Sequence, residues 1–566
     1  MKDKTSTVVL SGAGTAREDA LPHTTRPFLL TLPPEILRYI LEYAVITGSL
    51  PRIAATCRAL RPLALELLYK TLTIGANLGG LSIHQIESLM DPDHSGLKFT
   101  RDLRILDCRG NSSNEYPEGL SSDDIATIVR PIMEMHLRLL LRRFKPGQLR
   151  GFHLLTHQED RFKTLPILLL NALKTRVEHL SLPQELIRAW VDDLPSNSMK
   201  SIFRGLESFR LTNLYSSQDF NDLWGILEDN VDSLKTLYLS AILKYGQITW
   251  DLFCLDGGDP VFRCSLAEIT SNLIAMRTNI HLVHLQHLRL RGIANLHVLR
   301  NVSCNNLFNL YGLRTLRLDS CAAADEFISE IGRNNLAPNL RSLQLFGSCN
   351  SQTLNQVIPL LQPLETLYLS PYLKAHPADL EKLSFQILNR HRATLIRLWF
   401  EDPMLQIPPP GIATPDPRSD LGDLPRAEEV AFAVGHSRLI PQINLPLNIR
   451  LLRILDSFPS VSDLDGPQAL IEYAMGIAER HVARCKGQKP ALSLISFGPY
   501  RSYLDTQDFV TDDVRVKLFV SFEENDKMVW VPVLTMAEPR EIQERYPEFD
   551  IVHGEGPEGP WQPEYS

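Results

Sequence analysis

The stretch TLPPEILRYILEYAVITGSLPRIAATCRALRPLALELLYKTLTI (residues 31–74) has the apolar spacing of three short helices followed by a strand. Pro33 and Pro34 suit the start of a helix, because the amides they lack would have no partner in the first turn. Apolar residues then return at helical intervals through two further short segments. The alternating Leu72-Thr73-Ile74 favours a strand. We therefore expect a helical segment over residues 27–68 that runs directly into a sheet.

A second pattern, L-x-x-L-x-L, returns along the chain after residue 74. Seven of the nine intervals between its copies are 24 to 31 residues long, and the longer gaps at 103–149 and 234–285 leave room for an insertion or a degenerate copy. Apolar residues at helical spacing lie between the copies, so a strand followed by a helix is the predicted unit. The copies begin at Leu103, Leu149, Val177, Leu206, Leu234, Leu285, Leu313, Leu340, Leu364 and Leu395.

Both patterns are similar to known families. Residues 31–74 resemble the F-box in Leu-Pro-x-Glu-Ile-Leu at 32–37, in Ile40-Leu41, in Cys57-Arg58 and in Tyr69-Lys70, although Leu60 stands where an aromatic residue is common in that family. Residues 69–402 resemble leucine-rich repeats in their period, with Asn111 and Cys321 at the ninth position, where that family usually has Asn or Cys. The alternative for residues 31–74 is an ordinary helical cap on a larger core.

The resemblance implies the fold class. We expect an α/β repeat in which an N-terminal three-helix F-box runs into an irregular leucine-rich-repeat solenoid, capped by a C-terminal β-hairpin. Strands are predicted at 514–522 and 528–533, and seven prolines within residues 401–426 exclude regular structure there. The predicted domains are a disordered N-terminus (1–26), the F-box-like helices (27–68), the solenoid (69–402), a Pro-rich exposed loop (403–427), degenerate repeats with the cap (428–540) and an acidic tail (541–566).

Composition and charge exclude several classes of protein. The chain has 566 residues, of which 44% are hydrophobic and 22% charged, and its apolar runs are too short to span a bilayer. The N-terminus lacks the composition of a signal or transit peptide, so we expect a cytoplasmic or nuclear protein without a membrane partner. Eight cysteines without a CxxC pair predict free thiols. The net charge is −8, and residues 541–566 hold seven acids and one arginine, so the nearly neutral body predicts no nucleic-acid partner.

No motif in the sequence predicts catalysis. The string G-x-G-x-x-G at 554–559 lies in an acidic, Pro-containing tail and opens no helix, so it does not predict a dinucleotide site. Three histidines within residues 281–287 have no Cys or Glu at metal-ligand spacing. The basic stretch at 137–145 is expected to be a repeat helix with one solvated side. We therefore expect no cofactor, no metal and no enzyme, and an enzyme within residues 428–566 is the least favoured alternative.

The predicted binding residues form two sets. The F-box resemblance implies that the N-terminal helices bind a Skp adaptor through Leu32, Pro33, Ile36, Leu37, Ile40, Leu41, Cys57 and Tyr69. In the repeats, the fifth and seventh positions project from the concave face, where Arg, Tyr and Trp are typical of protein interfaces, although a wet sheet face also tolerates them. The predicted substrate-binding residues are Arg210, Tyr238, Arg289, Arg291, Arg317, Gln344, Phe346, Tyr368 and Trp399.

The resemblance implies a function that follows from these two sets. We expect a non-catalytic substrate-recognition subunit of a Skp–cullin–F-box ubiquitin ligase, which binds the Skp adaptor, through it a cullin scaffold, and an unknown protein substrate on the solenoid. Such a subunit raises the effective concentration of a substrate near the conjugating enzyme. The alternative is a leucine-rich-repeat interaction scaffold that does not assemble with a cullin.

Overall fold

The chain falls into two compact units, Met1–Leu67 and Leu68–Ser566. The computed structural model describes residues 32–46, 50–77, 80–81, 83–91, 96–107, 135–145, 147–155, 177–183, 187, 204–214, 223, 225–241, 282–292, 308–319, 321, 324–347, 349–371, 383–401, 421–433, 444–456, 467–485, 490–499, 516–524 and 527–536.

The first unit contains helices α1 (Pro34–Ile46) and α2 (Leu50–Thr56) and most of α3 (Arg61–Lys70). The carbonyl of Pro33 accepts the first helical hydrogen bond of α1 from the amide of Leu37 at 3.0 Å, as expected for a proline-initiated helix. Arg38 on α1 forms an ion pair with Glu66 on α3. The buried apolar side chains described in this unit are Leu37, Leu41, Leu50, Ala54, Leu60 and Ala64.

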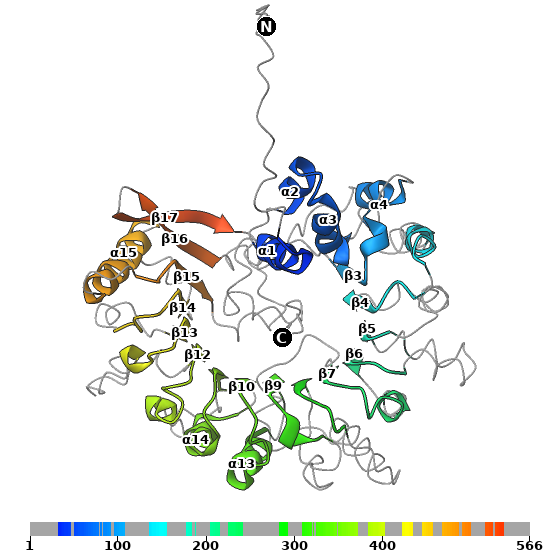
Figure 1. Ribbon diagram of the computed structural model, residues 1–566. Helices are drawn as coiled ribbons and strands as arrows, with labels where there is room; N and C mark the ends of the chain where they lie inside the picture. Colours follow the sequence, from blue (N-terminus) through cyan, green and yellow to red (C-terminus); the bar gives the residue numbers. More distant parts are fainter. Residues whose placement is uncertain are drawn as a thin grey trace, which may run out of the picture. The chain divides into compact units, whose positions relative to one another are not determined.

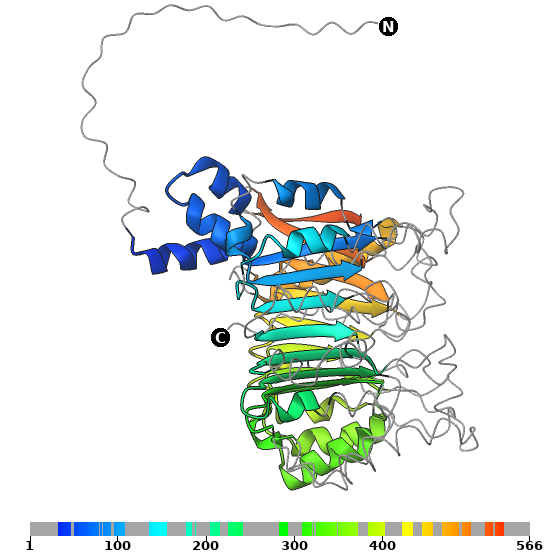
Figure 2. The same ribbon diagram turned by 90° about the vertical axis from the view of Figure 1, so that its right-hand side faces the viewer.

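The second unit is built on one sheet in which fourteen strands run parallel and each pairs with the next (Figures 1 and 2). The first of them, β1, begins at Thr71, directly after α3. The parallel strands are β1 (Thr71–Asn77), β3 (Asp102–Asp107), β4 (Gly151–Leu155), β5 (His179–Pro183), β6 (Ser208–Leu214), β7 (Thr236–Ala241), β8 (His287–Arg291), β9 (Thr315–Asp319), β10 (Ser342–Phe346), β11 (Thr366–Ser370), β12 (Arg397–Phe400), β13 (Glu429–Ala433), β14 (Leu451–Asp456) and β15 (Leu494–Pro499).

Three antiparallel strands complete the sheet. The short β2 (Gly80–Leu81) pairs with β1. At the other end β16 (Val516–Glu524) pairs with β15, and β17 (Lys527–Met536) pairs with β16. The last two strands therefore lengthen the sheet, and the described edge of the sheet at this end is β17.

Helices connect several of the parallel strands. Figure 1 shows α13 (Ala324–Asn334), α14 (Ser351–Val357) and α15 (Pro467–Arg484) on the outer side of the strands to which they are linked. A Cβ at Gly332 of α13 would lie 2.8 Å from the Val357 side chain of α14, so only glycine permits this close approach of the two helices. Other described helices of this unit include α4 (Ile83–Met90), η2 (Leu97–Phe99), η4 (Leu310–Gly312), η5 (Ile358–Leu360) and η7 (Phe385–Leu388).

The core lies between the strands and these helices, and the strand leucines alternate into it. In β9, for example, Leu316 and Leu318 are fully buried and belong to the same apolar cluster as Phe327 of α13. The strand register shows that one copy of the sequence pattern begins three residues earlier than predicted. Leu103 pairs with Phe152, the fourth position of its copy, so the buried Thr100 and not Leu103 stands at the first position of the β3 copy.

In two of the described connections, polar side chains hydrogen-bond to the backbone that leads into the preceding strand. The Oδ1 atom of Asn230 accepts the amide of Leu206 at 2.7 Å, and the hydroxyl of Ser233 donates to the carbonyl of Leu206 at 2.8 Å. The same pair of hydrogen bonds recurs further along the chain. Nδ1 of His391 accepts from the amide of Leu364 at 3.1 Å, and the hydroxyl of Thr394 donates to the Leu364 carbonyl at 2.7 Å. Asn230 and His391 stand four residues before a core leucine, so they occupy equivalent positions.

The buried, hydrogen-bonded position of His391 predicts that the stability of the protein falls at acid pH. His391 is fully buried, its Nε2–H donates to the carbonyl of Ile358 at 3.1 Å, and burial lowers its pKa. The unfolded chain therefore binds the proton first as pH falls below about 6.5, and stability is lost from there until the pH passes the lower pKa of the folded state. We expect His391→Asn, which places the residue of the equivalent position 230 here, to keep the amide bond and to flatten the pH dependence of unfolding.

Urea unfolding of the wild type and of His391→Asn between pH 8 and pH 5 tests this expectation. Because one proton is involved, the slopes of the free energy of unfolding against pH differ by at most about 1.4 kcal/mol per pH unit. Equal slopes for wild type and His391→Asn would show that His391 does not cause the acid sensitivity.

The predicted fold class is wrong. The structure is an α/β fold on one sheet with fourteen parallel strands, and neither a separate three-helix F-box nor a hairpin cap is evident in its described residues. The helix α3 crosses the boundary between the two units, so the first unit does not contain the whole of the three-helix segment. The strand β16 pairs with the last parallel strand, β15, so β16 and β17 continue the sheet instead of ending it with a separate hairpin. The parallel register continues from β1 to β15 with one shift, between β6 and β7.

Predictions for single segments of the chain had mixed outcomes. The helix α15 lies within the region predicted to hold degenerate repeats, residues 428–540. The strand β13 was missed because Ala427 stands where other copies have leucine, although it is fully buried there. Residues 1–26, most of the Pro-rich segment 403–427, and the acidic tail 541–566 lie outside the described residues, as does Asn111.

Candidate functional site

The helix α1 presents an apolar surface to solvent. Ile36, Tyr39 and Ile40 are 48%, 74% and 39% exposed, and their spacing of three and four residues places them side by side on one face of the helix. Leu37 and Leu41 occupy the neighbouring face and are buried. We call Ile36, Tyr39 and Ile40 the α1 surface. It is an apolar helix face of the kind that partner proteins cover.

The predicted adaptor-binding residues are divided between environments. Ile36, Ile40 and Pro33 are exposed, and Leu32 and Cys57 are half-buried. Leu37 and Leu41 belong to the buried side chains of the first unit. Tyr69 falls in the second unit, where its half-buried ring faces Gly96 so closely that a Cβ at residue 96 would lie 2.6 Å from the ring. The structure thus brings Ile36 and Ile40 together with Tyr39, which sequence reasoning omitted.

The predicted substrate-binding residues fall into two rows that run across the sheet. The main row holds one side chain from each strand, on the face opposite the leucine core. The second row lies two residues further along each strand, where Arg291, Asp319 and Phe346 are in register. The pairings align, in order from β6 to β12, Arg210, Tyr238, Arg289, Arg317, Gln344, Tyr368 and Trp399.

Arginine side chains surround Tyr238 in this row. The guanidinium of Arg210 lies 4.5 Å from the ring centroid of Tyr238, and that of Arg289 lies 4.6 Å from the same centroid. Both distances are within the range of cation–π attraction, which is stronger for desolvated groups. We call Arg210, Tyr238, Arg289, Arg291 and Arg317 the arginine cluster.

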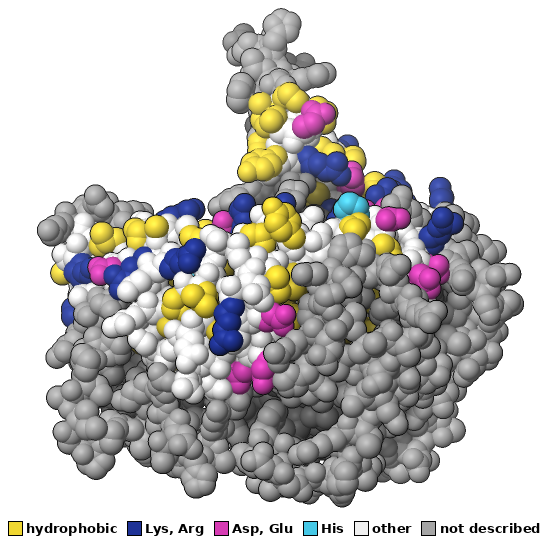
Figure 3. All heavy atoms as spheres, turned by 90° about the horizontal axis from the view of Figure 1, so that it is seen from below, with side chains coloured by type: hydrophobic (Ala, Val, Ile, Leu, Met, Phe, Trp, Pro, Cys, Tyr) yellow, Lys and Arg dark blue, Asp and Glu magenta, His cyan; other side chains and the backbone are white. Residues whose placement is uncertain are grey.

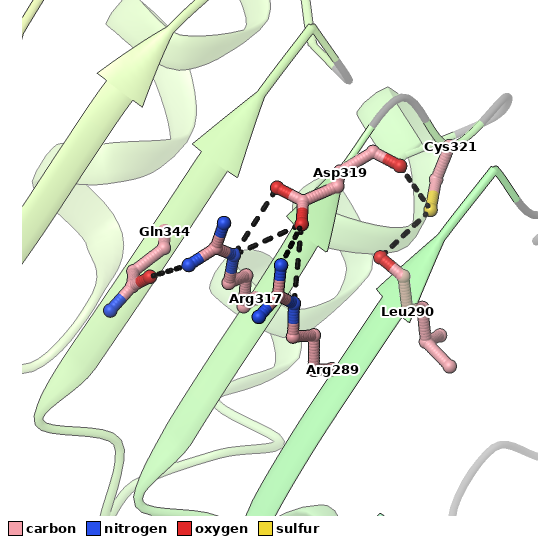
Figure 4. Close-up of polar contacts among 6 residues, drawn as sticks. All are labelled: Arg289, Leu290, Arg317, Asp319, Cys321 and Gln344. Atoms are coloured by element: carbon pink, nitrogen blue, oxygen red, sulfur yellow. Dashed lines mark hydrogen bonds and ion pairs between the residues drawn. The ribbon is translucent and has the colours of Figure 1, made fainter. Parts of the chain in front are cut away.

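One carboxylate connects two guanidinium groups of this cluster (Figure 4). Asp319 Oδ2 accepts from Nη2 of Arg289 at 3.1 Å and from Nε of Arg317 at 3.0 Å. Arg317 also donates from Nη1 to Oε1 of Gln344 at 3.3 Å. The thiol of Cys321, just beyond β9, donates to the carbonyls of Leu290 and Asp319 at 3.4 Å. Asp319 was not among the residues predicted from the sequence, although it stands at the seventh repeat position, from which Arg291 and Phe346 were predicted.

Aromatic rings continue the row after Gln344. The ring centroids of Phe346, Tyr368 and Trp399 lie 6.2 to 6.3 Å from one another, as in favourable edge-to-face and tilted packing. We call these three residues the aromatic cluster. The Nε1–H of Trp399 donates to Oε2 of Glu401 at 3.3 Å, and the guanidinium of Arg453 lies 5.3 Å from the Trp399 ring. Arg453 was missed because it belongs to the weaker copy at β14.

The positive charge of the row changes the acidity of its members. Burial raises the pKa of the Tyr238 hydroxyl, but the charges of Arg289, Arg210 and Arg291 outweigh burial and lower it to about 8. At β4, burial together with the charge of Arg104 and other cationic groups holds the pKa of His153 well below its usual value. The Tyr238 shift reflects the positive charge of the arginines on β6 and β8, whereas the His153 shift is caused first by burial.

The row exposes little surface. Arg291 and Gln344 are half-buried, and the other predicted substrate-binding residues are 1 to 9% exposed. Ion pairs and cation–π contacts are therefore formed at low dielectric, where they are stronger than in water. At the edge where the strands begin, by contrast, ion pairs such as Lys235–Glu207 (2.8 Å) and Arg341–Glu365 (3.1 Å) are exposed. Figure 3 shows basic and acidic side chains interspersed on the described surface.

The remaining sequence candidates carry no site in the structure. His284 is exposed, and Nδ1 of the half-buried His287 lies 3.1 Å from the hydroxyl of Thr315, while His281 and the glycines at 554–559 are outside the described residues. The described residues contain no group of His, Cys, Asp and Glu side chains arranged to hold a metal ion. Within the same residues, no helix has the length and apolar composition needed to cross a bilayer.

Comparison with known proteins does not assign the chain to a family. No protein-family model matches the chain, and no curated protein is significantly similar to it. Function is therefore inferred from the geometry of the chain itself.

Proposed function

We propose that this protein is a non-catalytic substrate-recognition subunit of a Skp–cullin–F-box ubiquitin ligase. The α1 surface binds the Skp adaptor, and the row across the sheet binds the protein to be ubiquitinated. The observation that carries the proposal is the exposure of Ile36, Tyr39 and Ile40 on α1, in a stretch whose sequence resembles the adaptor-binding segment of that class. Packing of these three side chains against an adaptor removes apolar area from water, at about 25 cal/mol per Å².

The proposed function gives a role to each of the two predicted sets of binding residues. An adaptor contact in the first unit and a substrate contact in the second let one chain hold both partners at once, and this raises the effective concentration of substrate near the ligase. The subunit itself then requires no catalytic group.

Capture experiments with the full chain test this function. The tagged chain is mixed with purified Skp adaptor and then with a cullin, and bound proteins are quantified. We expect the chain to retain the adaptor and, only when adaptor is present, the cullin. Adaptor without cullin would favour the alternative, an interaction scaffold that does not enter a ligase. Failure to retain the adaptor would overturn the proposal.

A further inference from the structure

Exposed cations gather at the edge of the sheet where β3 and β4 begin. They come from three segments: the turn before β3, the helix at residues 135–141 with the turn that follows it, and the residue before β4. Their side chains are all exposed, unlike those of the row. We call these residues the basic patch: Lys98, Arg101, Arg138, Arg142, Lys145 and Arg150.

Hydrogen bonds around Gln148 hold the three segments together. The buried side chain of Gln148 donates from Nε2 to the carbonyl of Thr100 at 3.2 Å, and its Oε1 accepts from the amide of Lys145 at 3.1 Å. The carbonyl of Arg101 accepts from the amide of Arg150 at 2.7 Å. Backbone groups and a neutral side chain, rather than carboxylates, therefore keep the cations close to one another.

Carboxylates do not balance this charge among the residues that the structure describes. Arg150 pairs with Glu178 at 3.7 Å, and the other members of the basic patch have no carboxylate at ion-pair distance within the described ranges. Arg101 donates from Nη1 to a backbone carbonyl at 3.3 Å, and the ammonium of Lys98 lies 4.8 Å from the centroid of the Phe99 ring. Like charges at this density raise the local potential, so they attract an anionic partner.

The helix at residues 135–141 adds apolar groups to the same surface. Met135 and Leu139 are 50% and 37% exposed, and their spacing from Arg138 and Arg142 places all four residues on one helical face. The leucines of the opposite face belong to the apolar core: Leu137, Leu140 and Leu141. Arg138 and Arg142, four residues apart, repel each other, and a bound anion removes this cost. The exposed face thus suits a partner that is both acidic and apolar.

The C-terminal segment of the same chain has this composition. Residues 541–566 hold seven acidic residues and one arginine, which gives a net charge of −6. Within this segment the sequence EFDIV at 548–552 places acidic and apolar residues next to one another. The segment therefore matches both the charge and the apolar groups of the basic patch.

The chain is long enough to bring this segment to the basic patch. β4 and β17 are thirteen strands apart in the sheet, which corresponds to at most about 62 Å at about 4.8 Å per strand. The 30 residues from 537 to 566 can extend to about 100 Å. Because the segment is tethered to the surface that it would bind, its effective concentration approaches the millimolar range, at which a weak contact is populated.

We propose that residues 541–566 bind the basic patch of the same molecule. Their carboxylates bind the arginine and lysine side chains, and Phe549 and Ile551 pack against Met135 and Leu139. An external anionic partner reaches the basic patch only after it displaces this segment. The inference concerns a surface that the proposed function does not use, so neither depends on the other.

Zero-length crosslinking of the full chain tests this contact. A carbodiimide joins a carboxylate to a lysine amine that touches it, and residues 541–566 contain no lysine, so each product identifies the lysine that the segment contacts. We expect mass spectrometry to find crosslinks from the segment to Lys98 and Lys145. Their yield should fall at least about fivefold in about 0.5 M NaCl, because salt screens exposed charges. A mixture of unlabelled and 15N-labelled chains separates contacts within one molecule from contacts between two.

A charge reversal connects the crosslinks to the basic patch. We expect Arg138→Glu/Arg142→Glu, which leaves both lysines in place, to lower the yield at least about fivefold. The matched control is Arg314→Glu/Arg333→Glu, which makes the same charge change at two exposed arginines outside the basic patch and should keep the wild-type yield.

A second variant tests the apolar contact without changing a charge. Phe549→Ser/Ile551→Ser keeps every carboxylate of the segment, and we expect it to lower the yield about threefold because apolar area is no longer buried. Crosslinks that are absent from Lys98 and Lys145, that join labelled to unlabelled chains, or that survive Arg138→Glu/Arg142→Glu would overturn the inference. Binding to phosphatidylserine vesicles in the absence of these crosslinks would assign the basic patch to a membrane surface instead.

Discussion

Replacement of both Ile36 and Ile40 by aspartate is expected to abolish capture of the Skp adaptor. Each isoleucine is 39–48% exposed, so burying it in an interface contributes roughly half of the about 1.5–3 kcal/mol of full burial, and each aspartate in its place adds the cost of burying a charge. The loss in affinity should therefore exceed about 100-fold, since each 1.4 kcal/mol is a factor of ten. Because both side chains are already exposed, the variant should keep the stability of the wild-type chain.

The matched control is Val482→Asp, which places the same charge on α15 at a residue 39% exposed, the same fraction as Ile40. We expect titration calorimetry with purified adaptor to give wild-type affinity for this variant and no measurable heat for the double variant. Wild-type affinity of Ile36→Asp/Ile40→Asp would remove the α1 surface from the adaptor interface.

Asp319→Ala is expected to destabilise the sheet by about 3–5 kcal/mol. The substitution removes the carboxylate that two buried guanidinium groups share, and loss of one partner from a buried ion pair leaves charge in a low-dielectric environment. The control is Glu365→Ala, which breaks the exposed pair with Arg341 and should cost about 0–1 kcal/mol.

Urea unfolding followed by far-ultraviolet circular dichroism measures both variants. Replacing Arg289, Arg317 and Asp319 together by Met, Met and Leu should recover much of the stability lost in Asp319→Ala, because no charge then remains unpaired. A loss below about 1 kcal/mol for Asp319→Ala would mean that this carboxylate does not hold the two arginines in place.

Spacing in the sequence was sufficient to locate most of the sheet. The leucines of β4 to β12 stand in the copies that the pattern singled out, because alternate residues of a strand must be apolar to enter a one-sided core. The row from Arg210 to Trp399 followed from the same periodicity, since residues between core positions face the other way. The pattern did not place two copies correctly, because Thr100 and Ala427 stand where other copies have leucine. The core accepts a small residue at both positions.

The sequence by itself determined the period of two residues within each strand and about 28 residues between strands, and thereby which side chains share a face. Only the tertiary structure decided how these elements combine: one sheet of fourteen parallel strands extended by antiparallel ones, a third helix divided between two units, and two last strands that lengthen the sheet. It also decided that Asp319 binds both Arg289 and Arg317 and that Ile36 is exposed while Leu37 is buried. The physical reason is that periodicity encodes the direction of a side chain from its own backbone, whereas its partners come from strands and helices tens of residues away.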